Sequence, residues 1–321
     1  MGIRTKQNDH YFLVRLAAAR RLYTLAKKGQ NFYLMLNVVL VSVMAFLSIA
    51  LNSAMVGKYF GFKPIDISNL VAVVSVIVLT LDKILVAGVI EKNKEDAAKI
   101  QDQVDRKLFG LALNTPLVGS APNSALVAKH GEWLLKREGT APFENWYALR
   151  DDKLIHPYQV LICQNACLSW DANLRSKVNT IFLILGFVIF GAALGLSIYM
   201  NLSTLSALTN LVALAGPVAD FGYAVYSGNK KAIEDTQRLM DHLTDAIESP
   251  VNSEEELLKM CQMVQDQLYI KRRDSWPIPD KLYQWLRNQD ESVMVDSAID
   301  LETQLLAKQA ATTGAPTPIT L

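Results

Sequence analysis

The apolar residues of this chain gather in two blocks, and each block contains two long apolar runs. Each run meets the roughly 20 apolar residues that a helix needs to cross a bilayer. The sequence therefore predicts an all-α membrane protein with four transmembrane helices in two pairs. The predicted spans are Phe32–Val56 and Asn69–Ile90, then Val178–Met200 and Leu205–Tyr226.

Outside the spans, apolar residues recur with the period of amphipathic helices, and no alternating strand pattern is found. Ser253 and Glu256 have the spacing of a capping box, which predicts a helix beginning there. We expect an N-terminal helix at 1–31, spans at 32–90 and 178–226, a helical domain at 91–177, C-terminal helices at 227–310 and a disordered tail at 311–321.

Basic residues indicate how the chain is oriented. The segments before the first span and after the second and fourth are rich in Lys and Arg, whereas the connection within the second pair, "NLST", has none. Lys58 and Lys63 are the basic residues between the first two spans. By the positive-inside rule, both termini and the domain at 91–177 face the cytosol. The N-terminal cluster comprises Arg15, Arg20, Arg21, Lys27 and Lys28.

Two predicted spans contain ionisable residues. Without Asp82 and Lys83, the second run would be too short for a hydrocarbon core of about 30 Å, so both are placed within the span. Asp220 lies in the fourth span, about as far from its cytosolic end as Lys83 is in the second. An ion pair between them, snorkelling of Lys83, and the lining of a polar conduit all remain open. The candidate pore or gate residues are Asp82, Lys83, Asn210 and Asp220.

The usual signs of catalysis, metal binding and nucleic-acid binding are missing. The net charge of +1 gives no case for DNA or RNA as a partner. No nucleophile elbow, zinc-protease motif or phosphate loop occurs, and the four histidines are isolated from one another. The three cysteines are typical of reduced thiols, and Cys163 and Cys167 have no second ligand pair to complete a metal site. We expect no enzyme, no metal and no cofactor.

Aromatic, arginine and glutamine side chains are better candidates for binding a small ligand. Aromatic faces stack on bases, and guanidinium groups hold phosphates. Structural roles remain open: Trp146 and Trp170 as core residues, and Asp171 with Arg175 as a pair on a helix surface. The candidate ligand-binding residues are Arg20, Tyr23, Gln101, Arg106, Trp146, Tyr147, Gln164, Trp170 and Arg175.

Five stretches, taken together with the order of the spans, resemble the SMODS-associating four-transmembrane effector family. Val104 and Ala112 depart from that family's pattern, which has an aromatic residue and a tryptophan there. The stretches are "QNDHYFLVRLAAARRLYTLAK" (Gln7–Lys27), "IQDQVDRKLFGLALN" (Ile100–Asn114), "NWY" (Asn145–Tyr147), "CQNACLSWDANLR" (Cys163–Arg175) and "QDQLYIKRRDSWPIPDKLYQWLR" (Gln265–Arg287).

The resemblance implies an effector of cyclic-oligonucleotide-based antiphage signalling (CBASS) in the bacterial inner membrane. Such an effector binds a cyclic di- or trinucleotide made by a partner synthase, forms a homo-oligomer, and disrupts the lipid bilayer to cause abortive infection. Two alternatives remain open. One is a regulated small-solute or ion channel or transporter that cyclic nucleotides do not gate. The other is a membrane-embedded enzyme that uses Cys163 or a histidine.

Overall fold

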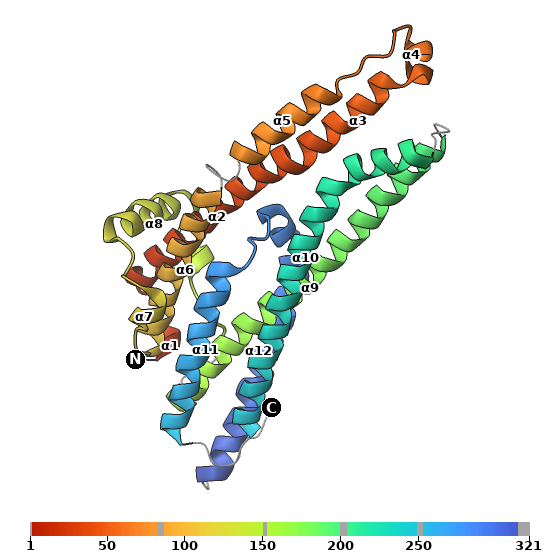
Figure 1. Cartoon of the computed structure of the whole chain (residues 1–321). Coiled ribbons are helices and arrows are strands. Elements are labelled where there is room, and N and C mark those ends of the chain that lie inside the picture. Colours follow the sequence, from red (N-terminus) through yellow and green to blue (C-terminus); the bar gives the residue numbers. More distant parts are fainter. Residues whose placement is uncertain (1, 82–86, 150–152, 200–203, 249–252, 314–321) are drawn as a thin grey trace. The chain divides into compact units, whose positions relative to one another are not determined.

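The computed structural model describes residues 2–81, 87–149, 153–199, 204–248 and 253–313 (Figure 1). Within these ranges every regular element is a helix, which confirms the all-α prediction at that level. The N-terminal half contains α1 (Ile3–Lys6), α2 (His10–Leu34), the π-helix η1 (Met35–Leu40), α3 (Val41–Asn52), α4 (Ala54–Phe60), α5 (Ser68–Leu81), α6 (Ala87–Phe109), α7 (Thr115–Val118), α8 (Ser124–Glu138) and the 3-10 helix η3 (Ala141–Phe143). The C-terminal half contains α9 (His156–Tyr199), α10 (Thr204–Glu248), α11 (Glu254–Asp274) and α12 (Asp280–Thr313).

The chain divides into two compact units. The residue ranges of all four predicted spans fall within unit 2, and α2, α6, α9 and α10 each supply residues to both units. Unit 1 comprises Met1–Leu25, Lys92–Arg175 and Lys231–Leu321, and unit 2 comprises Ala26–Glu91 and Ser176–Lys230.

Unit 2 carries long apolar helices. Among the described residues, two stretches are long and apolar enough to cross a membrane, His10–Asn52 and His156–Ala192, and each begins in unit 1 and continues into unit 2. Helix α5 contains a shorter apolar stretch, Ser68–Val78. Helices α3 and α5 pack side by side (Figure 1). The other predicted spans, and the four-span topology, remain predictions.

A hydrogen bond and an aromatic contact join α9 to α10 inside unit 2. Asn229 donates a hydrogen bond to the Asn179 side chain at 3.0 Å, and both residues are buried. The rings of Phe182 and Phe221 lie 6.0 Å apart on the same two helices. A buried amide pair satisfies its own hydrogen bonds and therefore fixes the register of the two helices.

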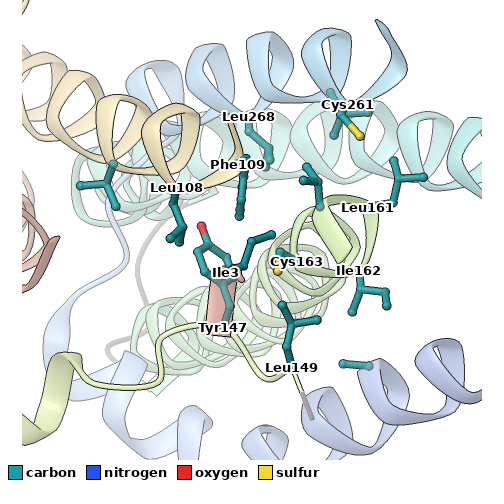
Figure 2. Close-up of a cluster of buried hydrophobic side chains, with 14 of the residues drawn as sticks. Ile3, Leu108, Phe109, Tyr147, Leu149, Leu161, Ile162, Cys163, Cys261 and Leu268 are labelled. Carbon is teal, nitrogen blue, oxygen red and sulfur yellow. The ribbon is translucent and has the colours of Figure 1, made fainter. Parts of the chain in front are cut away.

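Unit 1 has a well-packed apolar core. Phe109, Phe143, Leu161 and Leu268 are buried there, and Figure 2 shows Phe109, Leu161 and Leu268 together although they come from three different helices. Helix α8 approaches α2 at Gly131, where an added Cβ would lie 2.2 Å from the Val14 carbonyl oxygen. Only glycine permits so close a contact between two backbones.

The boundaries of the C-terminal helices test the local predictions. Ser253 and Glu256 form both hydrogen bonds of the predicted capping box at the start of α11, so that prediction is confirmed. Helix α12 runs to Thr313, three residues past the predicted boundary at 310. The remainder of the predicted tail lies outside the described residues.

Candidate functional site

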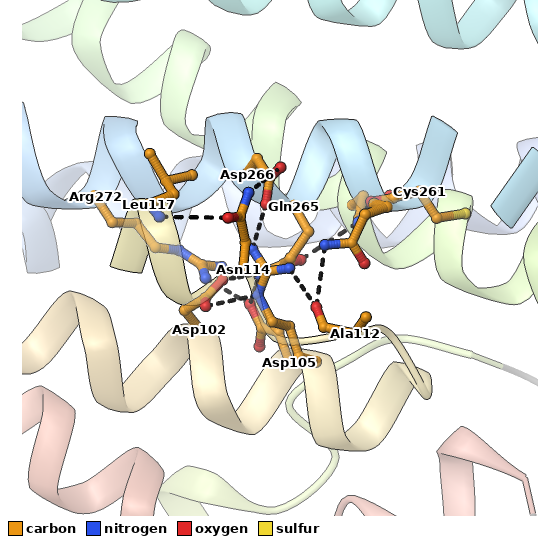
Figure 3. Close-up of polar contacts among 12 residues, drawn as sticks. Asp102, Asp105, Ala112, Asn114, Leu117, Cys261, Gln265, Asp266 and Arg272 are labelled. Carbon is orange, nitrogen blue, oxygen red and sulfur yellow. Dashed lines mark hydrogen bonds and ion pairs between the residues drawn. The ribbon is translucent and has the colours of Figure 1, made fainter. Parts of the chain in front are cut away.

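A network of buried charges joins α6 to α11 inside unit 1. Arg106 is 1% exposed and donates from Nε to Asp102 at 2.7 Å and from Nη2 to Asp266 at 2.6 Å. Its Nη1 donates to the carbonyl of Ala112 at 2.7 Å. Figure 3 shows Asp102, Ala112 and Asp266 converging from α6, the following loop and α11. Each nitrogen of this guanidinium thus has a partner, as a buried charge requires.

Asp105 is the second centre of this network and is fully buried. Its carboxylate accepts hydrogen bonds from the Tyr147 hydroxyl at 2.6 Å and from Gln265 at 3.2 Å, and it forms an ion pair with Arg272. Burial opposes charge on Arg272, but the ion pair with Asp105 prevails and raises the pKa of Arg272 well above its ordinary value. Burial also raises the pKa of Tyr147, which keeps this phenol protonated as a donor.

Asp171 holds two cations on one carboxylate oxygen. Its Oδ2 accepts from Arg175 Nε at 2.8 Å and from Lys271 Nζ at 2.9 Å. Burial alone would raise the pKa of Asp171, but Arg175 and Lys271 outweigh it and lower the pKa to about 2. Lys271 also donates to the Thr236 hydroxyl of α10. We call Asp171, Arg175 and Lys271 the Asp171 cluster.

Tyr23 of α2 has a buried hydroxyl in unit 1. The oxygen is buried and has no hydrogen-bond partner among the described residues. Burial raises the pKa of Tyr23; Arg272 and Arg175 oppose that rise, and Asp105 and Asp171 add to it.

The N-terminal segment is tied to the segment before α9. The Gln7 side chain accepts from the backbone N–H of Tyr147 at 2.8 Å and donates to its carbonyl at 3.3 Å. Asn8 accepts in the same way from the backbone N–H of Asn145 at 2.8 Å. Asn145 has φ 51°, a left-handed conformation that asparagine tolerates better than most residues. These contacts position the Tyr147 hydroxyl that donates to Asp105.

The five stretches that carry the family resemblance meet in this part of unit 1. Gln7 and Tyr23 come from the first stretch, Asp105 and Arg106 from the second, and Tyr147 from the third. Gln164, Asp171 and Arg175 come from the fourth, and Gln265, Lys271 and Arg272 from the fifth. Residues far apart in the sequence therefore form one polar interior.

The structure gathers only some of the candidate ligand residues. Arg106, Tyr147, Gln164 and Arg175 belong to the buried network, whereas the buried hydroxyl of Tyr23 has no hydrogen-bond partner among the described residues. Gln164 donates to the carbonyl of Cys261 at 2.8 Å. The interpretation of Asp171 and Arg175 as a pair on the helix surface needs correction: the pair exists, but the Arg175 side chain is only 7% exposed.

The other candidate ligand residues lie apart from the network or at its margin. Arg20 pairs with Glu138 at 3.5 Å on the surface. Trp146 is 38% exposed, so it is not a core residue. Half-buried Trp170 contacts the ring of Tyr283 edge-on at 6.3 Å, and Gln101 is also half-buried.

The candidate pore residues are largely untested. Asp82 and Lys83 lie outside the described residues. Asn210 is within α10, and nothing of its side chain is described. Asp220 is an exposed residue of α10.

Five charged residues of the site were missed from the sequence: Asp102, Asp105, Asp266, Lys271 and Arg272. A signal for two of the acids existed, because Asp102 and Asp105 share a helix face with buried Ala98 and Phe109. Carboxylates on the apolar face of an amphipathic helix indicate a buried partner. Nothing in the local sequence distinguishes Lys271 and Arg272 from surface cations.

The thiols of unit 1 are shielded. Cys163 and Cys261 are buried, Cys167 is partly buried, and all three are free. Burial raises the pKa of Cys261 to about 12 and raises the pKa of Cys163 as well, so neither is a reactive thiolate at neutral pH. Within the described part of the chain, no three His, Cys, Asp or Glu side chains come together as a metal site.

Comparison with known proteins decides the family. The model of the SMODS-associating 4TM effector domain matches residues 1–301. The chain belongs to this family. A probable CBASS effector molecule of Bacillus cereus (strain VD146) is 24% identical over 226 residues, which cover 68% of this chain and 74% of that protein. No solved structure matches the chain.

Family and relative together indicate a CBASS effector, a context that implies a functional link to a cyclic-oligonucleotide synthase. The family description and the two long apolar helices indicate a membrane protein.

Proposed function

We propose that this member of the SMODS-associating 4TM effector family is a ligand-gated antiphage effector of the bacterial inner membrane. A cyclic di- or trinucleotide binds unit 1 on the cytosolic side. Unit 2 then opens or assembles with other copies and disrupts the bilayer, which causes abortive infection. The family match over residues 1–301 carries this proposal.

The surface of unit 2 supports a membrane location. Large apolar side chains are exposed along its helices, including Met35 at 66%, Val76 at 64% and Phe187 at 76%. In water such a surface would be a liability, whereas in lipid it is the stable arrangement. In this proposal the spans cross the membrane as two pairs, with both termini in the cytosol.

The chemistry of unit 1 supports a polar, anionic ligand. Its interior gathers several cations and a tyrosine hydroxyl without a partner, and half-buried aromatic Trp170 is in the same unit. These are the groups that recognise phosphates and bases. A ligand shifts the assembly toward an open state only as far as it binds that state more tightly.

Dye release tests the proposal. The purified full-length protein is reconstituted into liposomes loaded with a self-quenching dye, and a panel of cyclic di- and trinucleotides is added. We expect one of them to trigger release, whereas linear dinucleotides of the same bases serve as the matched control. No release with any cyclic compound would remove the gating proposal. Equal release without nucleotide would favour a constitutive channel instead.

A further inference from the structure

A π-turn interrupts the first apolar helix inside unit 2. Among the described residues only Met35–Leu40 (η1) forms a π-helix, and it joins α2 to α3 within the long apolar stretch His10–Asn52. A π-helix bonds residues five apart, whereas an α-helix bonds residues four apart, and single π-turns inside α-helices occur frequently at functional sites. The turn therefore holds about one residue more than an α-helix that covers the same angle.

Asn37 inside this turn is incompletely satisfied. The residue is 8% exposed, and its side-chain oxygen Oδ1 has no hydrogen-bond partner among the described residues. Its Nδ2 donates to the carbonyl of Tyr33 at 3.4 Å, the carbonyl that an α-helix would pair with the backbone N–H of Asn37. Leaving a buried acceptor unpaired is unfavourable. The observed winding is thus not the best hydrogen-bonding arrangement for this residue.

The helices on the two sides of η1 have different neighbours. Before the turn, Gly29 lets Ile90 of α6 pack against the backbone of α2, where an added Cβ would lie 2.9 Å from Ile90 Cγ1. Beyond the turn, α3 packs against α5, which also contacts η1. Helix α3 has no charged residue, and its buried Ala45 and its exposed Phe46 are both apolar. Rotation of α3 about its own axis therefore exchanges one apolar face for another and places no charge in lipid.

We propose that η1 is a two-state joint of unit 2: the π-turn is its closed state, and rewinding to an α-helix rotates α3 by about 100° against α2 and opens the unit. This proposal rests on the proposed function and names the element that the bound ligand changes. At constant chain length, rewinding turns each residue of α3 to the direction that the following residue now has. Ala45, which is 7% exposed, takes the direction of Phe46 at 45%, and Phe46 takes that of Leu47 at 46%.

Fluorine NMR on the full-length protein in lipid nanodiscs measures the rotation. A trifluoromethyl label is attached to Ala45→Cys or Phe46→Cys, relaxation by oxygen dissolved in the bilayer reports lipid exposure, and the treated parent protein corrects for its own thiols. Replacing Asn37, Val38 and Val39 by alanine keeps the length and favours the α-helix, because alanine has the highest helix propensity. Without ligand, this alanine variant should raise the oxygen relaxation at position 45 to the level of position 46. Position 46 is the control and should not change.

Deletion of Val38 should have the opposite effect. It removes the extra residue, so the turn becomes α-helical with α3 in its present orientation, and no rewinding remains. In the dye-release assay, the rate with the activating cyclic nucleotide should fall at least about tenfold, while the unfolding temperature does not fall. Inserting an alanine after Leu40 in the deletion variant restores the length and should restore release. The alanine variant should release dye without nucleotide.

The outcomes separate the joint from the proposed function. Exposure of position 45 in the alanine variant, with loss of release on deletion of Val38, supports both. Triggered release that survives the deletion keeps the proposed function and overturns the joint. If no cyclic compound triggers the parent protein but position 45 is exposed in the alanine variant, the joint stands and cyclic nucleotides are removed as its trigger. A label at position 45 that stays shielded in every variant overturns the joint.

Discussion

The two units of this protein differ in the side chains that break the usual pattern of burial: unit 1 buries charged groups, and unit 2 exposes large apolar ones. Unit 1 encloses carboxylates and guanidinium groups: Asp102 and Asp105 are fully buried, and Arg106 is 1% exposed. Unit 2 leaves large apolar groups uncovered, with Phe187 at 76% and Met35 at 66%. The buried charges of unit 1 are stable only if each has an ion-pair or hydrogen-bond partner. The exposed apolar surface of unit 2 is stable in lipid.

Both units are built from helices of the same period, but the surroundings of those helices differ. In unit 1 the apolar stripe of a helix faces a core and its polar face meets water, whereas in unit 2 apolar residues also cover the outside. The effect of a substitution on stability or membrane insertion therefore depends on the unit in which the residue lies as well as on the side chain that is introduced. The four predictions below exploit that difference, from the largest expected effect to the smallest.

Removing a buried charge from unit 1 should have the largest effect. Arg106→Met leaves Asp102 without its ion pair and Asp266 without one of its hydrogen-bond donors, which lowers the free energy of unfolding by about 3–5 kcal/mol. Urea unfolding in detergent, followed by tryptophan fluorescence, measures it. The matched control is Arg238→Met, whose pair with Asp235 is exposed, and it should change stability by under about 0.5 kcal/mol. Equal midpoints for both variants would contradict the structural role of the network.

Placing a charge on the outer surface should have the second-largest effect, and it should differ between the two units. Phe187→Lys adds an ammonium near the middle of the predicted third span, at an insertion cost of about 2.5–3.5 kcal/mol if lipid surrounds it. Leu113→Lys, at a residue of unit 1 that is 61% exposed, should cost almost nothing. The readout is the fraction of protein that alkaline carbonate extracts from membranes. If both variants stay in the membrane equally well, the exposed face of unit 2 does not contact lipid.

A single hydroxyl inside the network should have a smaller effect. Tyr147→Phe deletes the 2.6 Å hydrogen bond to Asp105 but leaves the ion pair with Arg272, so we expect a loss of about 1–2 kcal/mol. Tyr158 belongs to the apolar core of unit 1, and Tyr158→Phe, which also removes a tyrosine hydroxyl, is the control. Identical unfolding midpoints for the two variants would show that the bond adds nothing.

A fall in pH should lower the free energy of unfolding of unit 1 through protonation of His130. Burial, together with Arg21 and Lys129, lowers the pKa of His130, and Asp96 opposes this. The neutral ring accepts a hydrogen bond from Arg21 at 3.1 Å. Because the unfolded state binds the proton more readily, this contribution is complete above a pH of about 6.5 and is lost as the pH falls below it.

The matched variant for this effect is His130→Gln, whose amide oxygen accepts from Arg21 without titrating. Unfolding midpoints between pH 7 and pH 5 should fall less steeply for the variant than for the parent protein. Parallel slopes would mean that other groups set the acid sensitivity. The expected change is the smallest of the four because His130 is only half-buried.

Local features of the fold were predictable from the sequence for a simple reason: neighbours along a helix create them. The capping box of Ser253 and Glu256 needs only residues three apart, and it is present as predicted. The absence of strands from the described residues follows from the helical period in the same way. The pair of Asp171 with Arg175 was also visible at a spacing of four, but its burial was not.

The sequence by itself determined the helices, the two apolar blocks and the membership of the family, because each depends on residue type and spacing along one chain. Only the tertiary structure decided what the charged residues of unit 1 do. It placed Lys271 beside Asp171 and Arg272 beside Asp105, residues 100 and 167 positions apart. Burial and partnership set the energy of a charge, and both are created when distant helices pack together.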